Sequence, residues 1–279
     1  MKDLENKVVL VTGAAKGIGK ATAIEFAKNG SRLILADIDE DGLKTTAEEI
    51  KKLGKEVMFV KTDVSDPKSV ENLVNKSISK MGRVDVLANI AGILIMAEMK
   101  DCDLSDWQKI INVNLWGPIH TVHYLLPHML KNGSGHIVNM SSGAGFIALP
   151  GSIVYGTSKY GVYGFSENLR IELDHYNIGV TVVGPAGVKT DMTQKLVGRG
   201  VFTVIDASKQ KLMPPEKIAK KIVKAVKKNK FILMPGISVK AVYYAKRISQ
   251  GFFNFGMKTL YKIVRKKAEK QSGKTKCRF

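Results

Sequence analysis

The chain has 279 residues, enough for one large α/β domain or two small ones, and 44% of them are hydrophobic, as in an ordinary globular protein. Its net charge of +19 is concentrated in residues 211–279, which hold 20 of the 44 Lys and Arg residues but only 2 of the 25 acidic ones. No stretch has the roughly 18 uninterrupted apolar residues of a membrane span, and the first apolar run is too short for a signal peptide. We therefore expect a cytoplasmic protein whose anionic partner, if any, meets the tail.

Strands and helices are predicted to alternate along the first 235 residues. Helical patterns, among them a long one over 107–129 and one that bears Tyr155 and Lys159 and runs to about residue 176, separate the predicted strands. Such alternation indicates βαβ units and a parallel sheet with helices on both faces. The predicted strands are short runs rich in Val, Ile and Leu at residues 7–12, 32–37, 56–61, 84–88, 136–140, 180–183 and 231–234.

Residues 191–213 interrupt this alternation. Apolar residues such as Met192, Leu196 and Phe202 stand there among glycines and polar residues, which favours a mobile, fairly apolar substrate flap. We expect a catalytic domain over residues 1–235 and a C-terminal extension over 236–279.

A glycine-rich turn follows the first strand and precedes a helix. Gly13, Gly17 and Gly19 let the backbone approach a phosphate closely, and the helix N-terminus offers free N–H donors, so the turn predicts a dinucleotide site. Asp37 ends the second strand, where its carboxylate can bind ribose hydroxyls and repel a 2′-phosphate. Lys16 favours a 2′-phosphate instead, so NAD is preferred and NADP stays open.

Tyr155 and Lys159 are four residues apart in a predicted helix, which places both side chains on one face. An ammonium group beside a phenol lowers the pKa of the phenol, so this pair is a candidate for proton transfer near neutral pH. The spacing alone is also common on solvated helix faces.

Taken together, these motifs resemble those of the short-chain dehydrogenase/reductase (SDR) family. The resemblance covers about residues 5–235. It depends on Thr12-Gly13-x-x-x-Gly17-Ile18-Gly19, Asp63-Val64, Asn89-Ile90-Ala91-Gly92, Asn114, Ser142, Tyr155-x-x-x-Lys159 and Pro185 with Thr190. It implies a Rossmann-type, doubly wound, three-layer α/β/α fold with about seven strands, and NAD(P)-linked interconversion of alcohols and ketones.

The resemblance also implies residue roles. Asn114, Ser142, Tyr155 and Lys159 match the catalytic tetrad, with Tyr155 as general acid or base and Asn114 fixing a water that relays protons. The residues implied to bind or border the cofactor are Gly13, Lys16, Gly17, Ile18, Gly19, Asp37, Asp63, Val64, Asn89, Ala91, Gly92, Tyr155, Lys159, Pro185, Val188 and Thr190. No metal site is expected. A non-catalytic dinucleotide-binding scaffold or sensor of the same fold is the alternative.

The tail from residue 236 alternates large apolar residues with lysines and arginines. This pattern is typical of a basic amphipathic helix, which can lie on an anionic membrane or pack on the main body or another subunit. Its density of apolar residues argues against nucleic acid. Apolar residues such as Leu94 and Phe146, together with the flap, favour an apolar alcohol or ketone substrate that is steroid-, fatty-acyl- or lipid-like. The family resemblance implies a homo-oligomer.

Overall fold

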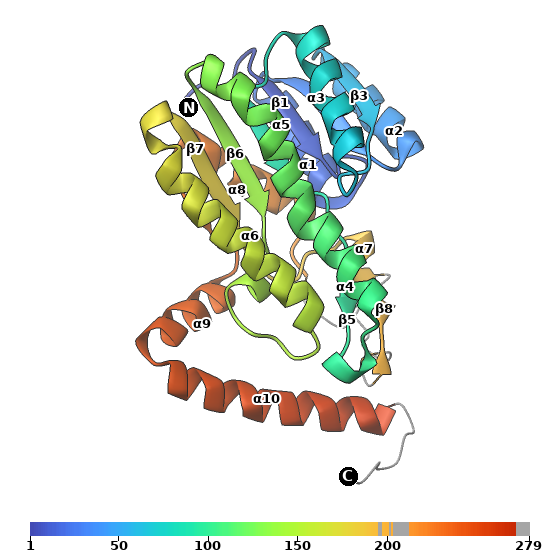
Figure 1. Ribbon diagram of the computed structural model, residues 1–279, viewed down its shortest axis with the longest axis vertical. Helices are drawn as coiled ribbons and strands as arrows, with labels where there is room; N and C mark the ends of the chain where they lie inside the picture. Colours follow the sequence, from blue (N-terminus) through green and yellow to red (C-terminus); the bar gives the residue numbers. More distant parts are fainter. Residues whose placement is uncertain (195–196, 201, 203–211, 272–279) are drawn as a thin grey trace.

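The computed structural model describes residues 1–194, 197–200, 202 and 212–271. Its centre is a seven-stranded parallel sheet with the order β3-β2-β1-β4-β6-β7-β9 (Figure 1). All seven predicted strands are confirmed. Their bounds are β1 Val8–Thr12, β2 Arg32–Asp37, β3 Val57–Lys61, β4 Val86–Asn89, β6 Gly135–Met140, β7 Ile178–Val183 and β9 Ile232–Leu233.

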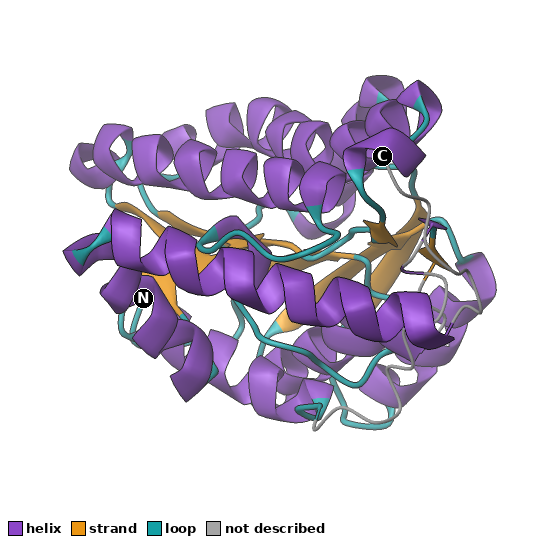
Figure 2. Cartoon of the chain, turned by 90° about the horizontal axis from the view of Figure 1, so that it is seen from below, coloured by secondary structure: helices purple, strands orange, loops and turns teal. Residues whose placement is uncertain are grey.

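Helices cover both faces of the sheet, as expected for a doubly wound fold (Figure 2). Strand side chains alternate between the two faces: Val9 and Val11 pack on one, Val8 and Leu10 on the other. The first face is covered by α1 (Gly17–Lys28), α2 (Glu40–Lys51) and α8 (Pro215–Lys227), and the second by α3 (Pro67–Met81), α5 (Gly117–Lys131) and α6 (Ile153–Glu172). This arrangement is the predicted three-layer architecture.

Local sequence signals set where the helices begin. The Asp39 carboxylate accepts a hydrogen bond from the Gly42 N–H at the start of α2, and Asp66 caps α3 in the same way, directly before Pro67. Because all seven strands are parallel, their carboxyl ends meet at one edge of the sheet. The order turns between β1 and β4, and ligands of such folds bind at this point.

The long helix predicted over residues 107–129 is not one regular helix. It consists of α4 (Leu104–Ile111), a π-helical turn (Asn112–Trp116) and α5. The Gly117 N–H bonds back to the Asn112 carbonyl, five residues earlier. A Cβ at Gly117 would lie 2.9 Å from the Val64 side chain, so packing against that residue favours glycine at this position. A single wide turn of this kind leaves the hydrophobic pattern helical, so it escapes prediction from periodicity.

Several short elements surround the carboxyl edge. A second, two-stranded sheet pairs β5 (Ile95–Met96) with β8 (Val197–Gly198), and neither strand was predicted because two residues carry no periodic pattern. Short 3₁₀ turns span Met99–Asp101, Gly143–Gly145 and Asp174–Tyr176, and α7 spans Asp191–Gln194. Apart from residues 191–194, 197–200, 202 and 212–213, the predicted flap lies outside the described residues.

The predicted helical extension is present as α9 (Ile237–Ile248) and α10 (Gln250–Gln271). Both lie at the end of the molecule toward which the strands point (Figure 1). Tyr243 and Phe253 are buried against Phe146 and Ile147, in a third apolar cluster that joins the extension to the body. Among the described residues, no helix combines the length and the apolar character that crossing a membrane requires.

Candidate active site

The Tyr155–Lys159 pair lies in the first two turns of α6, at the carboxyl edge of the sheet. Lys159 is only 3% exposed, and its Nζ donates a hydrogen bond to the Met140 carbonyl at the end of β6, at 2.9 Å. The same Nζ lies 5.7 Å from the centre of the Tyr155 ring. The helical spacing therefore brings the two groups together in a buried place, and not on a solvated face.

Ser142 lies two residues after β6, near the same phenol. Its hydroxyl is near enough to Tyr155 to lower the pKa of the phenol, and its oxygen accepts from the Ala144 N–H at 3.2 Å. The neighbouring Ser141 hydroxyl donates to the Lys159 carbonyl at 2.8 Å. This last bond fastens the end of β6 to α6 and fixes the position of Ser142 relative to Tyr155.

The pKa of Tyr155 is shifted in the direction opposite to the one that the sequence predicts. Burial raises the pKa of the Tyr155 phenol, and the neighbouring Ser142 hydroxyl offsets this rise only in part. Burial also lowers the pKa of Lys159 to about 7. Desolvation disfavours the charged form of both groups. The prediction that Lys159 lowers the pKa of Tyr155 is therefore wrong for the protein side chains that the structure describes.

Asn114 lies in the π-helical turn and is fully buried. Its Oδ1 accepts from the Ile93 N–H at 2.8 Å, while its Nδ2 donates to the Ile93 carbonyl at 2.9 Å and to the Ser158 hydroxyl at 3.1 Å. Both N–H groups of the amide are thus in use within the protein. The side chain therefore ties the segment after β4 to α6.

The predicted glycine turn forms a cradle that admits no side chain. A Cβ at Gly13 would lie 2.8 Å from the backbone of Ala91, and one at Gly19 only 1.9 Å from the Gly13 carbonyl oxygen. Lys16, at the N-cap of α1, makes no side-chain cap bond and is exposed. The first N–H groups of α1 therefore face an open turn, which fits the pyrophosphate of a dinucleotide.

Asp37 lies beside this turn at the end of β2. Its Oδ2 accepts from the Ala15 N–H at 3.1 Å and its Oδ1 from the Asp39 N–H at 3.0 Å. These two bonds fix the carboxylate next to the glycine turn, at the place where an adenosine ribose would lie. Ile18, one residue before Gly19, is partly buried and packs on the first core cluster.

The remaining predicted cofactor residues lie along the same edge. Asp63 is exposed and its carboxylate accepts from Ser65, whereas Val64 is buried against Gly117. Asn89 is buried and bonds Asn139 at 2.9 Å and Thr121 at 2.7 Å. It therefore braces the sheet.

Gly92 brings the segment after β4 against the tetrad. A Cβ there would lie 3.1 Å from the Asn114 Oδ1 and 3.4 Å from the Lys159 Nζ. The Thr12 hydroxyl accepts from the N–H groups of Ile90 and Ala91, at 3.0 and 3.2 Å. The segment is thus fixed to β1 and lies close to Lys159 of α6.

The residues after β7 complete the edge. The Pro185 carbonyl accepts from the Gly143 N–H at 2.8 Å, and Val188 is buried. Thr190 approaches the glycine turn, since a Cβ at Gly17 would lie 3.3 Å from its methyl group. The structure thus brings together all the predicted site residues along one edge of the sheet.

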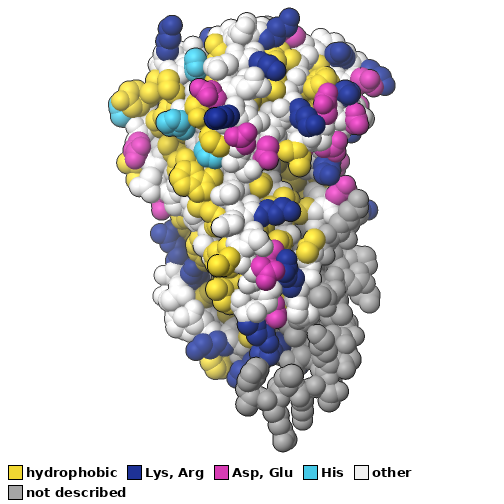
Figure 3. All heavy atoms as spheres, turned by 45° about the vertical axis from the view of Figure 1, so that its right-hand side comes forward, with side chains coloured by type: hydrophobic (Ala, Val, Ile, Leu, Met, Phe, Trp, Pro, Cys, Tyr) yellow, Lys and Arg dark blue, Asp and Glu magenta, His cyan; other side chains and the backbone are white. Residues whose placement is uncertain are grey.

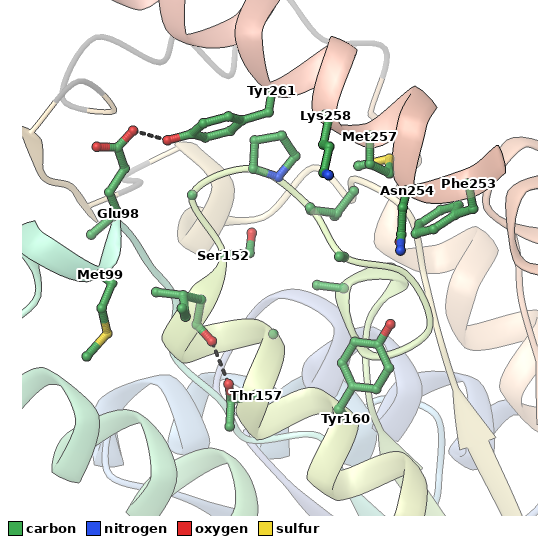
Figure 4. A pocket seen from close by; sticks show the side chains of 18 residues that line it. Glu98, Met99, Ser152, Thr157, Tyr160, Phe253, Asn254, Met257, Lys258 and Tyr261 are labelled. Carbon is green, nitrogen blue, oxygen red and sulfur yellow. Dashed lines mark hydrogen bonds between the residues drawn. The ribbon is translucent and has the colours of Figure 1, made fainter. Parts of the chain in front are cut away.

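A cavity of about 700 Å³ borders this edge, and α10 forms one of its walls (Figure 4). Ala144, Ser152 and Gly156, neighbours of Ser142 and Tyr155 in the chain, line the opposite wall. From α10, the side chains that line it are Phe253, Asn254, Met257, Lys258 and Tyr261. The sequence analysis missed these residues, although the spacing of Phe253, Met257 and Tyr261 places them on one helix face.

Glu98 anchors α10 at the rim of the cavity. It accepts a hydrogen bond from the Tyr261 hydroxyl and forms an ion pair with Arg265 at 3.7 Å (Figure 4). At the other end, the Lys246 Nζ of α9 donates to the Tyr160 hydroxyl of α6 at 2.8 Å. The extension is therefore bonded to the segments that carry the candidate site.

Comparisons with known proteins agree with this geometry. The family model "short chain dehydrogenase" matches residues 7–199. A putative oxidoreductase, SadH, of Mycobacterium tuberculosis is 34% identical over 261 residues, which cover 89% of this chain and 92% of that protein. The 3-oxoacyl-[acyl-carrier-protein] reductase FabG of Thermotoga maritima is 40% identical over 196 residues, covering 69% of this chain and 78% of that protein.

Comparison with solved structures supports the same family. A short chain dehydrogenase/reductase from Burkholderia phymatum, in complex with NAD, superposes with a TM-score of 0.82 at 26% identity. The match covers 90% of this chain and 96% of that one. The chain therefore belongs to the short chain dehydrogenase family and is an NAD(P)-dependent oxidoreductase.

Proposed function

We propose that the protein transfers hydride between NAD(P) and an apolar secondary alcohol or ketone, with Tyr155 as the general acid and base. The observation that carries this proposal is the Lys159 ammonium, which is buried one turn further along α6 than Tyr155, with its Nζ 5.7 Å from the centre of the Tyr155 ring. These groups lie beside a glycine turn that fits a dinucleotide pyrophosphate. When bound, the nicotinamide supplies or accepts the hydride.

Each side chain has a role that follows from its contacts. In the reductive direction, the Tyr155 phenol donates its proton to the substrate oxygen, and burial keeps that proton on the phenol beforehand. The Ser142 oxygen already accepts from Ala144, so its O–H remains free to donate to the substrate oxygen and steady its charge. In the oxidative direction, the same phenol oxygen takes the proton back.

Lys159 and Asn114 support this proton transfer. An ammonium has three donors, and Lys159 uses one on the Met140 carbonyl, which leaves two for a cofactor ribose and for proton exchange. Its pKa of about 7 lets it gain and lose a proton near neutral pH. We propose that Asn114 positions Ile93 and α6 through its side chain, while the π-helical turn provides the backbone group for a relay water.

An apolar substrate is supported by the cavity under α10. Met99, Leu149, Ile153, Phe253 and Met257 give it mainly hydrophobic walls, close to the residues that flank Ser142 and Tyr155. The relative named as a 3-oxoacyl-[acyl-carrier-protein] reductase acts, by its name, on a group attached to an acyl chain. We propose a substrate of this lipid-like kind, with its apolar part in the cavity.

We further propose NAD as the preferred cofactor, because the fixed Asp37 carboxylate would repel a 2′-phosphate. Lys16, exposed at the N-cap of α1, is the residue that would favour NADP. Residues 1–235 would form the catalytic domain. We also propose that the protein works in the cytoplasm as a homo-oligomer, and that its basic extension, residues 236–279, meets an anionic membrane and not a nucleic acid.

The substitution Tyr155→Phe tests the catalytic role. It should lower kcat by about 10²–10⁴-fold, because general acid–base catalysis is lost, while NADH binding followed by fluorescence stays within about twofold. Tyr176→Phe, at an exposed tyrosine, is the matched control and should change neither quantity. Retained turnover in Tyr155→Phe would overturn the mechanism. Cofactor binding without any turnover in the natural protein would favour the scaffold alternative.

A further inference from the structure

The extension has two faces with different surroundings. The inward face of α10 is occupied: Phe253 is buried in the third apolar cluster, and Tyr261 bonds Glu98. On α9, Tyr243 is buried and Lys246 bonds Tyr160. The interpretation that the tail packs on the main body therefore accounts for these side chains, but only for one side of each helix.

The outward face is apolar and uncovered. Phe252, Phe255 and Ile263 are 75%, 72% and 59% exposed, and their spacing of three and eight residues puts them on one side of α10. On α9, Ile248 is 87% and Tyr244 54% exposed. Large side chains that are uncovered together in this way indicate an interaction surface.

Cations flank these apolar side chains, and the only acidic residue in the sequence of α9 and α10 is Glu269, near the end of α10. Lys262 and Lys266 are exposed beside Ile263, and Lys240 and Arg247 are exposed on α9. The sequence from residue 217 to residue 268 contains no Asp or Glu. In Figure 3, Lys and Arg side chains gather at the lower end of the molecule, where α10 lies in Figure 1. The surface thus combines exposed apolar side chains with an excess of positive charge.

We propose that the outward face of α9 and α10, formed by Tyr244, Ile248, Phe252, Phe255 and Ile263 with their flanking cations, docks on an anionic lipid bilayer. The aromatic and aliphatic side chains would enter the interface, and the cations would meet lipid phosphates and carboxylates. A second copy of the same face would bring cations against cations. A nucleic acid would leave five large apolar side chains without partners.

This docking would also orient the active site. The cavity lies against the inward face of the same helix, so a protein bound through the outward face holds its cavity one helix diameter from the lipid surface. Resting on the proposed function, this geometry would deliver a lipid-like alcohol or ketone from the bilayer to the catalytic residues.

The test is flotation of the full-length protein with vesicles of phosphatidylcholine alone, or with 30% phosphatidylserine. We expect binding only to the anionic vesicles. Two double variants, Phe252→Ser with Phe255→Ser and Lys262→Glu with Lys266→Glu, should each lose at least about tenfold in bound fraction. The matched controls are Leu53→Ser, at an exposed leucine after α2, and Lys220→Glu with Lys224→Glu on α8. The controls should stay within about twofold.

Several outcomes would overturn the proposal. They are no binding of the natural protein to anionic vesicles, equal binding to neutral vesicles, or equal loss in the controls. A change in molecular mass in the Phe252 and Phe255 variant, without vesicle binding, would instead identify a self-interface. Turnover of a short, water-soluble secondary alcohol without vesicles is measured in parallel. It should be unchanged in all variants, and its absence in the natural protein would count against the proposed function alone.

Discussion

The behaviour of single residues at the site depends on burial as much as on spacing. The four-residue spacing of Tyr155 and Lys159 predicts that both side chains share a face of α6, and they do. It does not predict that the ammonium is buried with a single carbonyl partner, because that depends on β6 and on the segment after β4. The direction of the pKa shift of Tyr155 could not be predicted for the same reason.

The buried Lys159 should make stability depend on pH. Its pKa is about 7 in the folded protein and 10.5 in the unfolded chain, so between these values the unfolded state binds the extra proton. The free energy of unfolding should therefore gain up to about 1.4 kcal/mol per pH unit from this residue as the pH rises from about 7 toward 10. Lys159→Met should lose this contribution, as measured by urea unfolding at pH 7, 8 and 9.

Other groups can also contribute to the pH dependence, so the quantity to compare is the change in the free energy of unfolding with pH in the natural protein and in each variant. Lys220→Met, at an exposed lysine of α8, should keep the full pH dependence of the natural protein. If the free energy of unfolding changed with pH equally in the natural protein and in Lys159→Met, Lys159 would not be the source of the pH dependence.

At the scale of elements, buried strands and long helices are predictable, and local irregularities are not. Runs such as Val8–Thr12 are apolar on both sides, a pattern typical of central parallel strands. The π-helical turn that holds Asn114 keeps the apolar spacing of its helix, and β5 and β8 have only two residues each. These features arise from tertiary packing, and they lie at the site, where local rules are most often broken.

Helix α10 should decide which substrates the enzyme accepts. Asn254 points toward the cavity, so Asn254→Trp should fill part of its volume of about 700 Å³ (Figure 4). We expect kcat/KM for a long secondary alcohol such as 2-dodecanol to fall by about tenfold, because its chain loses the apolar walls, while 2-propanol changes by less than about twofold. Steady-state kinetics across a series of chain lengths measures this.

Phe255→Trp provides the matched control, since it puts the same side chain on the outward face of the same helix. It should leave the whole series unchanged. If Asn254→Trp slowed short and long alcohols equally, the cavity would not hold the substrate chain.

At the scale of the whole molecule, the sequence shows which segment holds the positive charge, but it does not show which side chains of that segment form the exposed surface. Nearly all the excess positive charge lies after residue 210, and the structure gathers part of it on α9 and α10. Whether each apolar side chain of the extension faces inward or outward follows from how α10 lies across the carboxyl edge of the sheet. That placement depends on the bond between Tyr261 and Glu98, which lies about 160 residues earlier in the chain, so it cannot be predicted from the local sequence of α10.

The outer face of α6 should join two copies of the chain. Ile153 and Ile171 are 43% and 73% exposed and stand 18 residues apart, which is five full turns and so the same face. Between them lies Gly164, where a Cβ would meet nothing within 4 Å. A glycine inside a helix costs about 1 kcal/mol relative to alanine. No contact with the residues that the structure describes requires that glycine, but the close approach of a second α6 would.

Light scattering after size-exclusion chromatography can test this interface. The natural protein should have at least twice the chain mass of 30.6 kDa, and Gly164→Arg should weaken association by at least about tenfold, because a long charged side chain separates the two helices. Asn72→Arg, on the exposed side of α3, should leave the mass unchanged. A natural protein that runs at 30.6 kDa, or a Gly164→Arg variant with an unaltered mass, would exclude α6 as the subunit contact. Since Tyr160 on the neighbouring face bonds Lys246, a dimer formed through α6 would leave the extension in place.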